Sequence, residues 1–142
     1  MTAEVRGYAP GDEELRIILQ EARTIAVVGL SSRPERHSYN VADYLQQVGY
    51  RIVPVNPNEA EVLGERAYAS LLEVPDPVDL VDVFRRAEFT PEVARQAVQV
   101  GAKVLWLQLG ITSEEARRIA EEGGISVIMD ACLMIEHDRL GP

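Results

Sequence analysis

A short apolar run at residues 25–30 constrains the fold of this chain more than any other feature. The run reads Ile-Ala-Val-Val-Gly-Leu, is rich in β-branched side chains and is bounded by polar residues. Short runs of this kind are typical of strands that are covered on both faces. The run therefore predicts a central strand of a parallel sheet.

The residues after this run predict a tight turn and then a helix. Gly29 ends the strand, and residues 33–38 carry three groups that can be basic. Over residues 41–48, apolar side chains recur at i, i+3, i+4 and i+7, with Ser38 as the expected N-cap and Gly49 as the expected end. The free N–H groups and partial positive charge of a helix start favour a phosphate, so we expect an anion at this loop.

The rest of the chain alternates between strand and helix patterns, which is typical of a parallel sheet covered on both sides. The length of 142 residues is below the roughly 250 at which a second domain becomes common. We therefore predict a single α/β domain over residues 1–142, doubly wound and mostly parallel, with residues 1–10 as a loose arm. Further strands are expected at 50–57, 79–84, 103–109 and 126–129, and further helices at 12–22, 90–100 and 112–122.

Local signals predict where several of these elements begin or weaken. Asp12, Thr90 and Thr112 are the expected N-terminal caps of their helices, and Pro91 suits the first helical position. Pro54 lies inside the second expected strand and has no N–H to donate, so we expect this strand to fray or to stay unpaired on one side from there.

The charge balance restricts the class of partner. The formal net charge is −9, the sequence pI is about 4.7, and no stripe of Lys and Arg is present. Nucleic acid and acidic membranes are therefore unfavourable partners, whereas one small anion needs only local positive potential. The single cysteine cannot form an internal disulfide, and no apolar run approaches the ~18 residues of a membrane span. We expect a soluble cytoplasmic protein without a signal peptide.

Ligands of doubly wound folds bind outside the carboxyl ends of the strands, where the strand order reverses. The segments expected there are 31–38, 56–57, 84–86 and 108–111. Their basic side chains suit phosphate oxygens, although solvated loop charges are an equal alternative. Trp106 lies between two leucines in an expected strand, which favours a core position over a ligand platform. The basic side chains concerned are Arg33, Arg36, His37, Arg85 and Arg86.

Features of a dinucleotide site and of a catalytic site are weak. Ser31 and Ser32 follow Gly29 where the G-x-G-x-x-G fingerprint requires a further glycine, and Asn56 ends the second strand in place of an acidic residue. Both departures count against a dehydrogenase. The two histidines are far apart in the sequence, and no metal spacing exists.

One pair of residues suggests reactive chemistry. Asp130 and Cys132 follow the last expected strand closely, and a carboxylate beside the only thiol could form a reactive pair. A lone cysteine near a strand end is, however, more often a small buried apolar residue.

Several motifs, taken in order, resemble the small stand-alone CoA-binding proteins of bacteria and archaea. The resemblance covers about residues 15–140. These proteins are similar to the CoA-binding domain of the succinyl-CoA synthetase α subunit, whose fold is Rossmann-type with helices on both faces. The motifs are Val28-Gly29-x-Ser31-x-x-Pro34-x-Arg36-x-Ser38, Tyr44-Leu45 with Gly49-Tyr50, the VPVNP segment at 53–57, Val83-Phe84-Arg85, Trp106-Leu107-Gln108-x-Gly110-Ile111 and Val127-Ile128-Met129-Asp130-x-Cys132.

The resemblance implies coenzyme A or an acyl-CoA as the ligand and names no catalytic residue. It implies that the phosphates lie against residues 31–33 and the helix start at Ser38, that the adenosine end lies near residues 56–57 with residues 84–85 beside it, and that the pantetheine arm follows residues 108–111. The family often has a basic residue where this chain has Ala131. The implied contacts are Gly29, Ser31, Ser32, Arg33, Arg36, Ser38, Asn56, Pro57, Phe84, Arg85, Gln108, Gly110 and Ile111.

Three functions follow as hypotheses. The first is a CoA-binding module without its own catalytic activity, which delivers or senses CoA, with a protein partner as an option. The ligase reaction is not expected, because the synthetase's second domain, with its phosphorylated histidine, has no counterpart in 142 residues. The second is an NAD(P)-binding oxidoreductase, or an acyl-CoA-handling enzyme subunit that uses Asp130 and Cys132. The third is a Rossmann module that has lost its ligand and serves protein interaction.

Overall fold

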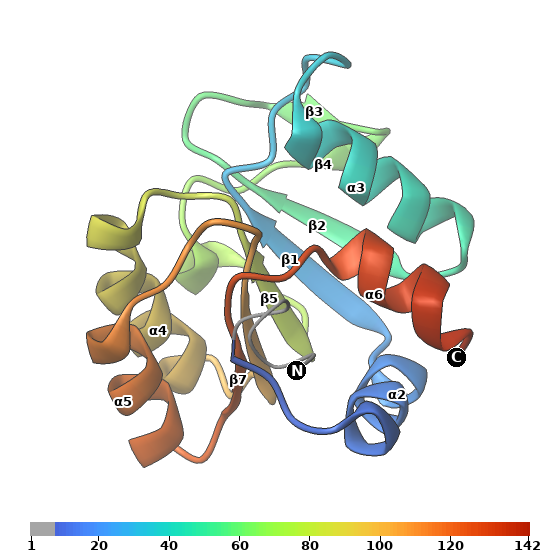
Figure 1. Ribbon diagram of the computed structural model, residues 1–142. Coiled ribbons are helices and arrows are strands. Elements are labelled where there is room, and N and C mark those ends of the chain that lie inside the picture. The colour runs from blue at the N-terminus through green and yellow to red at the C-terminus, as the bar shows by residue number, and fades with distance from the viewer. Residues whose placement is uncertain (1–7) are drawn as a thin grey trace.

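A computed structural model describes residues 8–142, which form a parallel five-stranded sheet in the order β2-β1-β5-β6-β7 (Figure 1). Every pairing in this sheet is parallel, so the predicted doubly wound α/β fold is confirmed. Because β2 lies on one side of β1 and β5 on the other, the strand order reverses between β1 and β5. The strands are β1 Thr24–Val28, β2 Arg51–Val55, β5 Leu80–Val83, β6 Val104–Leu107 and β7 Ser126–Ile128.

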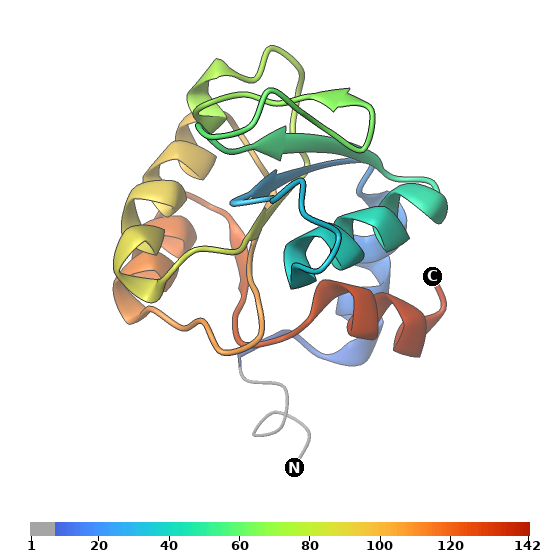
Figure 2. The same cartoon turned by 90° about the horizontal axis from the view of Figure 1, so that it is seen from above.

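Helices cover both faces of the sheet (Figure 2). One face packs against α2, α3 and α6, and the other against α4 and α5. A small hairpin of β3 (Glu61–Val62) and β4 (Glu65–Arg66) follows β2. Within residues 8–142, no helix has the length and apolar composition needed to cross a bilayer. The helices are α2 Asp12–Glu21, α3 His37–Gln47, α4 Thr90–Gln99, α5 Glu114–Glu122 and α6 Leu133–Leu140, with short 3₁₀ turns η1 Leu71–Glu73 and η2 Ala87–Phe89.

The central strands are buried on both faces, as the apolar run at 25–30 predicts. Ile25 and Val27 pack into the core beneath α2, α3 and α6, whereas Ala26 and Val28 pack into the core on the opposite face. Trp106 is fully buried, and its Nε1 donates a hydrogen bond of 2.8 Å to the Ala131 carbonyl. The predicted core position of this tryptophan is therefore confirmed.

Pro54 does not fray its strand, and the other outcome expected there, an unpaired side, agrees with the position of β2 at the edge of the parallel sheet. The strand continues past it, because the Val55 carbonyl accepts a hydrogen bond of 2.8 Å from Gly29 N–H. Alternate residues of β2 face β1, so the nitrogen of Pro54 faces the outer edge of the sheet, where no ladder bond is lost. There the Pro54 carbonyl accepts from Tyr68 N–H at 3.0 Å.

Four expected helix caps are wrong. Asp12, Ser38 and Thr90 lie within the first turns of α2, α3 and α4, and the cap of α5 is Ser113 rather than Thr112. Ser38 and Thr90 do not act as caps because their hydroxyls bond backbone groups of the segment before the helix instead of the helix N–H groups. The Ser113 hydroxyl accepts from the third residue of α5 at 3.1 Å.

Two chain segments differ from the sequence prediction near the termini. Tyr8 pairs with Met129 through two backbone hydrogen bonds of 3.1 and 2.8 Å, so the predicted loose arm is wrong at this residue. Residues 1–7 of that arm lie outside the described residues. The helix α6 was not predicted, and it buries Leu133 and Leu140 against α2 and α3.

Gly29 joins β1 to both neighbouring strands at a point with no room for a side chain. Its φ is +90°, and a Cβ built on it would lie 2.5 Å from the Phe84 carbonyl oxygen.

We predict that Gly29→Ala lowers the free energy of unfolding by about 2–5 kcal/mol, from the left-handed backbone and the clash together. Urea denaturation measures this change. In the control Gly124→Ala, φ is also positive (+84°) but the added Cβ has open space, so the free energy of unfolding should fall by only about 1–2 kcal/mol. Equal losses in the two variants would show that the contact with Phe84 does not contribute to the loss.

Asp82 is fully buried in β5 between Val27 and Trp106, and neither carboxyl oxygen has a partner within the described part of the chain. Burial raises the pKa of this carboxyl well above its ordinary value of 3.8. The folded protein therefore keeps a proton that the unfolded chain loses, so the stability falls as the pH rises above 3.8.

We predict that Asp82→Asn raises the melting temperature at pH 7, and that this gain shrinks towards pH 4 because both states are then increasingly protonated. Melting curves across this pH range test the prediction. The control is Asp79→Asn, since Asp79 accepts hydrogen bonds from Arg23 and Thr24 N–H at 2.9 and 3.0 Å and should show no such gain. A gain for Asp82→Asn that does not depend on pH would contradict this account.

Candidate functional site

A cavity of about 390 Å³ opens at the carboxyl ends of β1 and β5, where the strand order reverses. We call it the switch-point cavity. Its floor is apolar, from Val28, Val55, Leu71 and Val93, and its rim carries amide, hydroxyl and charged side chains. An apolar floor with a polar rim suits a flat ring system with polar edges. The remaining lining residues are Gly29, Asn56, Pro57, Asn58, Ala69, Ser70, Phe84, Arg85, Phe89, Glu92 and Gln96.

Five of the residues expected from the sequence line this cavity together. They come from three connections, the ends of β1, β2 and β5, which the parallel topology brings to one edge. Arg85 lies with its guanidinium carbon 4.3 Å from the centre of the Phe89 ring, a cation–π contact that holds this cation at the rim. The five residues are Gly29, Asn56, Pro57, Phe84 and Arg85.

Asn56 fixes the shape of the rim through its side-chain amide. Its Nδ2 donates to the Leu30 carbonyl at 3.0 Å, and its Oδ1 accepts from Asn58 N–H at 2.9 Å. The loop after β1 and the turn after β2 are thereby held in one arrangement. An acidic residue would supply no donor to Leu30, which gives a structural reason for an amide where dinucleotide-binding folds carry a carboxylate.

The loop between β1 and α3, residues 30–36, is held by its own serines. Ser31 N–H donates to the Ser38 hydroxyl at 3.1 Å, and the Ser31 hydroxyl accepts from Arg33 N–H at 3.1 Å. Ser38 is buried, so it braces the loop from beneath. Ser32 N–H donates to a carboxylate oxygen of Glu59 at 2.9 Å, which shows that this loop already accommodates an anionic oxygen.

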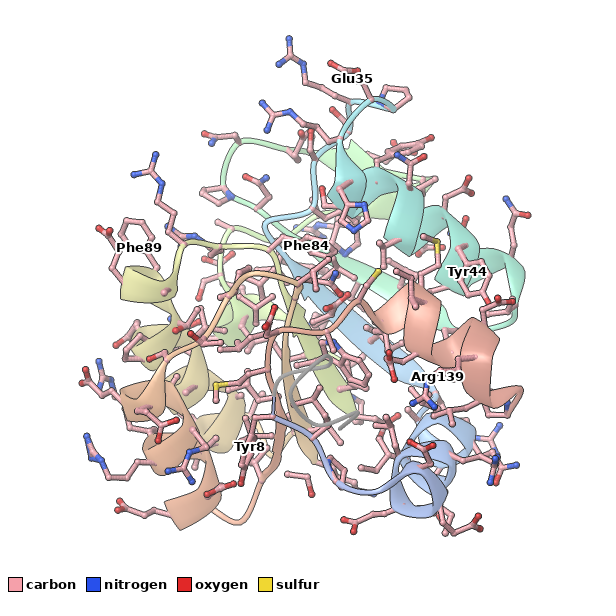
Figure 3. All side chains as sticks on the ribbon, in the orientation of Figure 1. Tyr8, Glu35, Tyr44, Phe84, Phe89 and Arg139 are labelled. Carbon is pink, nitrogen blue, oxygen red and sulfur yellow. The ribbon has the colours of Figure 1, made fainter. Side chains whose placement is uncertain are left out.

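The loop also supplies positive charge. Arg33 is exposed and pairs with Glu35 at 3.6 Å at the outer tip of the loop, where Figure 3 shows Glu35. Arg36 immediately precedes α3. Arg36 and Arg85, which lies at the cavity rim, are both exposed, and neither forms an ion pair within residues 8–142. Two guanidinium groups without a carboxylate partner therefore flank the start of α3 and the cavity, in a chain of net charge −9. Such an arrangement favours a phosphate-bearing ligand.

The three remaining expected residues lie in the next loop, after β6, and do not line the switch-point cavity. Gln108 is buried and its Oε1 accepts from Leu133 N–H at 3.1 Å. Gly110 N–H donates to Asp130 at 2.7 Å, and Ile111 N–H donates to the Gln108 carbonyl at 2.9 Å. Asp130 thus joins the loops after β6 and β7 in a structural role.

Sequence reasoning missed two features of this edge. Phe89 and the α4 residues of the cavity were not expected, although Phe89 follows Arg85 by four residues, a spacing that a helical turn brings together. The second feature is a contact between Cys132 Sγ and His37 Nε2 at 3.7 Å. These two residues are 95 positions apart, and no local pattern links them.

Known proteins of similar sequence and structure fall into two groups. A full-length match is the uncharacterized protein YneT of Bacillus subtilis, 46% identical over 128 residues that span 90% of this chain and 95% of YneT. A hypothetical protein from Pyrococcus horikoshii OT3 superposes with a TM-score of 0.91 at 41% identity, covering 94% of each chain. The second group contains large enzymes: subunit alpha of an ADP-forming acetate–CoA ligase (II) of Pyrococcus furiosus is 32% identical over 124 residues, which are 80% of this chain and only 27% of that subunit.

The family comparison agrees with the motifs noted in the sequence. Residues 23–138 match the family model described as CoA binding domain, and this range includes every residue expected in the site. The match covers well over half of the chain and extends across all five strands of the parallel sheet. This chain is therefore a member of the CoA-binding domain family.

Proposed function

We propose that this protein binds coenzyme A, or an acyl-CoA, along the carboxyl edge of its sheet. The observation that carries the proposal is the switch-point cavity with Arg85 at its rim, together with Arg36 immediately before the start of α3. Neither arginine has a carboxylate partner within residues 8–142. CoA combines a flat base, several phosphates and a long neutral arm. Each of these parts has a matching surface at this edge.

The adenosine end of CoA fits the switch-point cavity. Its apolar floor suits the base, and the amide of Asn56 together with Arg85 lies at the rim. The phosphates fit at residues 31–36, where Arg36 lies beside the N–H groups of the first turn of α3. The pantetheine arm then follows the loop after β6, beside Gln108 and Ile111.

NAD fits this edge less well. Asn56 occupies the end of β2, and both atoms of its amide already bond backbone groups of the protein. No carboxylate therefore stands at that strand end to bind ribose hydroxyls. Ser31 and Ser32 also leave less space near the loop backbone than glycines would.

The biological setting follows from the same proposal. The relatives include a protein named as a subunit of an acetate–CoA ligase, so a protein partner that receives or supplies the ligand is consistent with the family. Cys132 has no disulfide partner within the described chain, which suits a reducing compartment, and we place the protein in the cytoplasm. Neither nucleic acid nor a membrane is part of the proposal.

We predict that ligand-stripped protein binds CoA in isothermal titration and does not bind NAD or NADP. Arg36→Ala and Arg85→Ala should each weaken CoA binding about tenfold or more, because a charge-assisted hydrogen bond contributes about 1.5–3 kcal/mol. The matched control is Arg118→Ala, which removes the same charge from an exposed position on α5 outside the cavity and should change the affinity little.

Other outcomes of this titration identify the competing functions. Binding of NAD or NADP without CoA would replace the proposal with an oxidoreductase. Heat from none of these ligands would favour a module that serves only protein interaction. Equal losses in all three arginine variants would mean that the overall charge, and not the site, determines the affinity.

A further inference from the structure

The contact between Cys132 and His37 places a nucleophile beside a base. Cys132 immediately precedes α6 and His37 is the first residue of α3, so the two helix starts meet at this contact. The Sγ to Nε2 distance of 3.7 Å is within hydrogen-bond reach for a thiol. The imidazole can therefore take the proton when the thiol attacks a carbon atom.

A buried amide that bonds the backbone of the residue after Cys132 has a donor without a partner within residues 8–142. Gln108 is 2% exposed, and its Oε1 accepts from the backbone N–H of Leu133, the residue next to Cys132. Because an N–H can bond only to an acceptor, this contact fixes which end of the amide faces Leu133. The Nε2 group is left buried with no partner among residues 8–142, which is costly unless a ligand oxygen accepts from it.

Phe84 connects this place to the proposed CoA site. It lines the switch-point cavity, and its ring meets the edge of His37 with 6.0 Å between ring centres and 73° between ring planes. Cys132 is 3% exposed beneath these groups, whereas His37 is exposed and Phe84 is half-buried. The thiol is therefore buried in contact with an exposed imidazole, which in turn contacts a ring that lines the cavity.

From these contacts we propose that Cys132 accepts the acyl group of a bound acyl-CoA and holds it as a thioester. The inference rests on the proposed CoA binding. Cys132 Sγ attacks the thioester carbonyl carbon while its proton passes to His37 Nε2. Gln108 Nε2 donates to the carbonyl oxygen as negative charge develops there. The bond from carbon to the CoA sulfur breaks, the CoA thiolate takes the proton from His37, and S-acyl Cys132 and free CoA thiol are formed without oxidation or reduction.

Asp130 has no part in this step. Its carboxylate bonds Gly110 N–H at 2.7 Å and holds two loops together, so the partner of the thiol is His37. A cysteine that served only as a small buried apolar residue would need neither the contact with the His37 imidazole nor the unpartnered amide donor of Gln108 nearby.

The test is incubation of the full chain with acetyl-CoA, followed by intact mass, peptide mapping and titration of released thiol. We expect one acetyl group on Cys132 and an equal amount of free CoA. Cys132→Ser should abolish the labelling and retain CoA binding in calorimetry. His37→Gln should slow the labelling about 100-fold or more, the usual loss when a general base is removed.

His137→Gln is the matched control, because His137 is the other histidine of the chain and its ring nitrogen contacts the Tyr44 hydroxyl, not the thiol of Cys132. Its labelling rate should equal that of the parent. CoA binding without acetylation would overturn this inference and leave the proposed function intact, whereas absence of CoA binding would overturn both. Equal rates in His37→Gln and the parent, or a CoA adduct that a reductant removes, would also overturn the acyl transfer.

Discussion

The close contact between Gly29 and the backbone of Phe84 determines the shape of the edge on which the site lies. Gly29 N–H bonds the last residue of β2, while its Cα lies against the carbonyl of Phe84, the residue after β5. One residue therefore holds β1 between its two neighbours at the point where the strand order reverses. The cavity lies there because the connection after β1 crosses one face of the sheet through α3, whereas the connection after β5 crosses the other face through α4.

Local positive potential in an acidic chain is the second physical basis of the account. The net charge of −9 disfavours polyanions, yet Arg36 and Arg85 have no ion pair within residues 8–142. Six other arginines are neutralised at close range, as in the pairs of Arg139 with Asp12 and of Arg117 with Glu121. Arg23, Arg66, Arg86 and Arg118 also form no ion pair within residues 8–142. What distinguishes Arg36 and Arg85 is their position at the edge where the strand order reverses, beside the start of α3, whose N–H groups can also donate to a small anion.

The features predicted from the sequence were those that local patterns determine. The apolar run at 25–30 is buried on both faces, and the helix after it ends before Gly49 as its spacing predicts. The predicted cap at Ser38 was wrong because its hydroxyl accepts a hydrogen bond from Ser31 N–H in the preceding loop. The strand continues through Pro54 because β2 lies at the sheet edge, where the missing N–H breaks no ladder bond. The residues of a strand do not by themselves determine its position in the sheet.

The site was predicted in part for the same reason. Strand ends are recognisable in the sequence, and parallel topology then brings Gly29, Asn56 and Phe84 to one cavity. The contact of His37 with Cys132 depends on α6, which no expected pattern marked, and on packing across 95 positions. Gln108 was expected as a pantetheine contact, but its open amide donor appears only once the position of Leu133 is known.

A crystal structure of the protein with CoA tests the central claim most directly. The account predicts the base in the switch-point cavity, the phosphates at residues 31–36 with Arg36 and Arg85 in contact, and the CoA thiol beside Gln108 within reach of Cys132. A ligand whose base lies outside this cavity, or whose phosphates make no contact with the loop after β1, would contradict it.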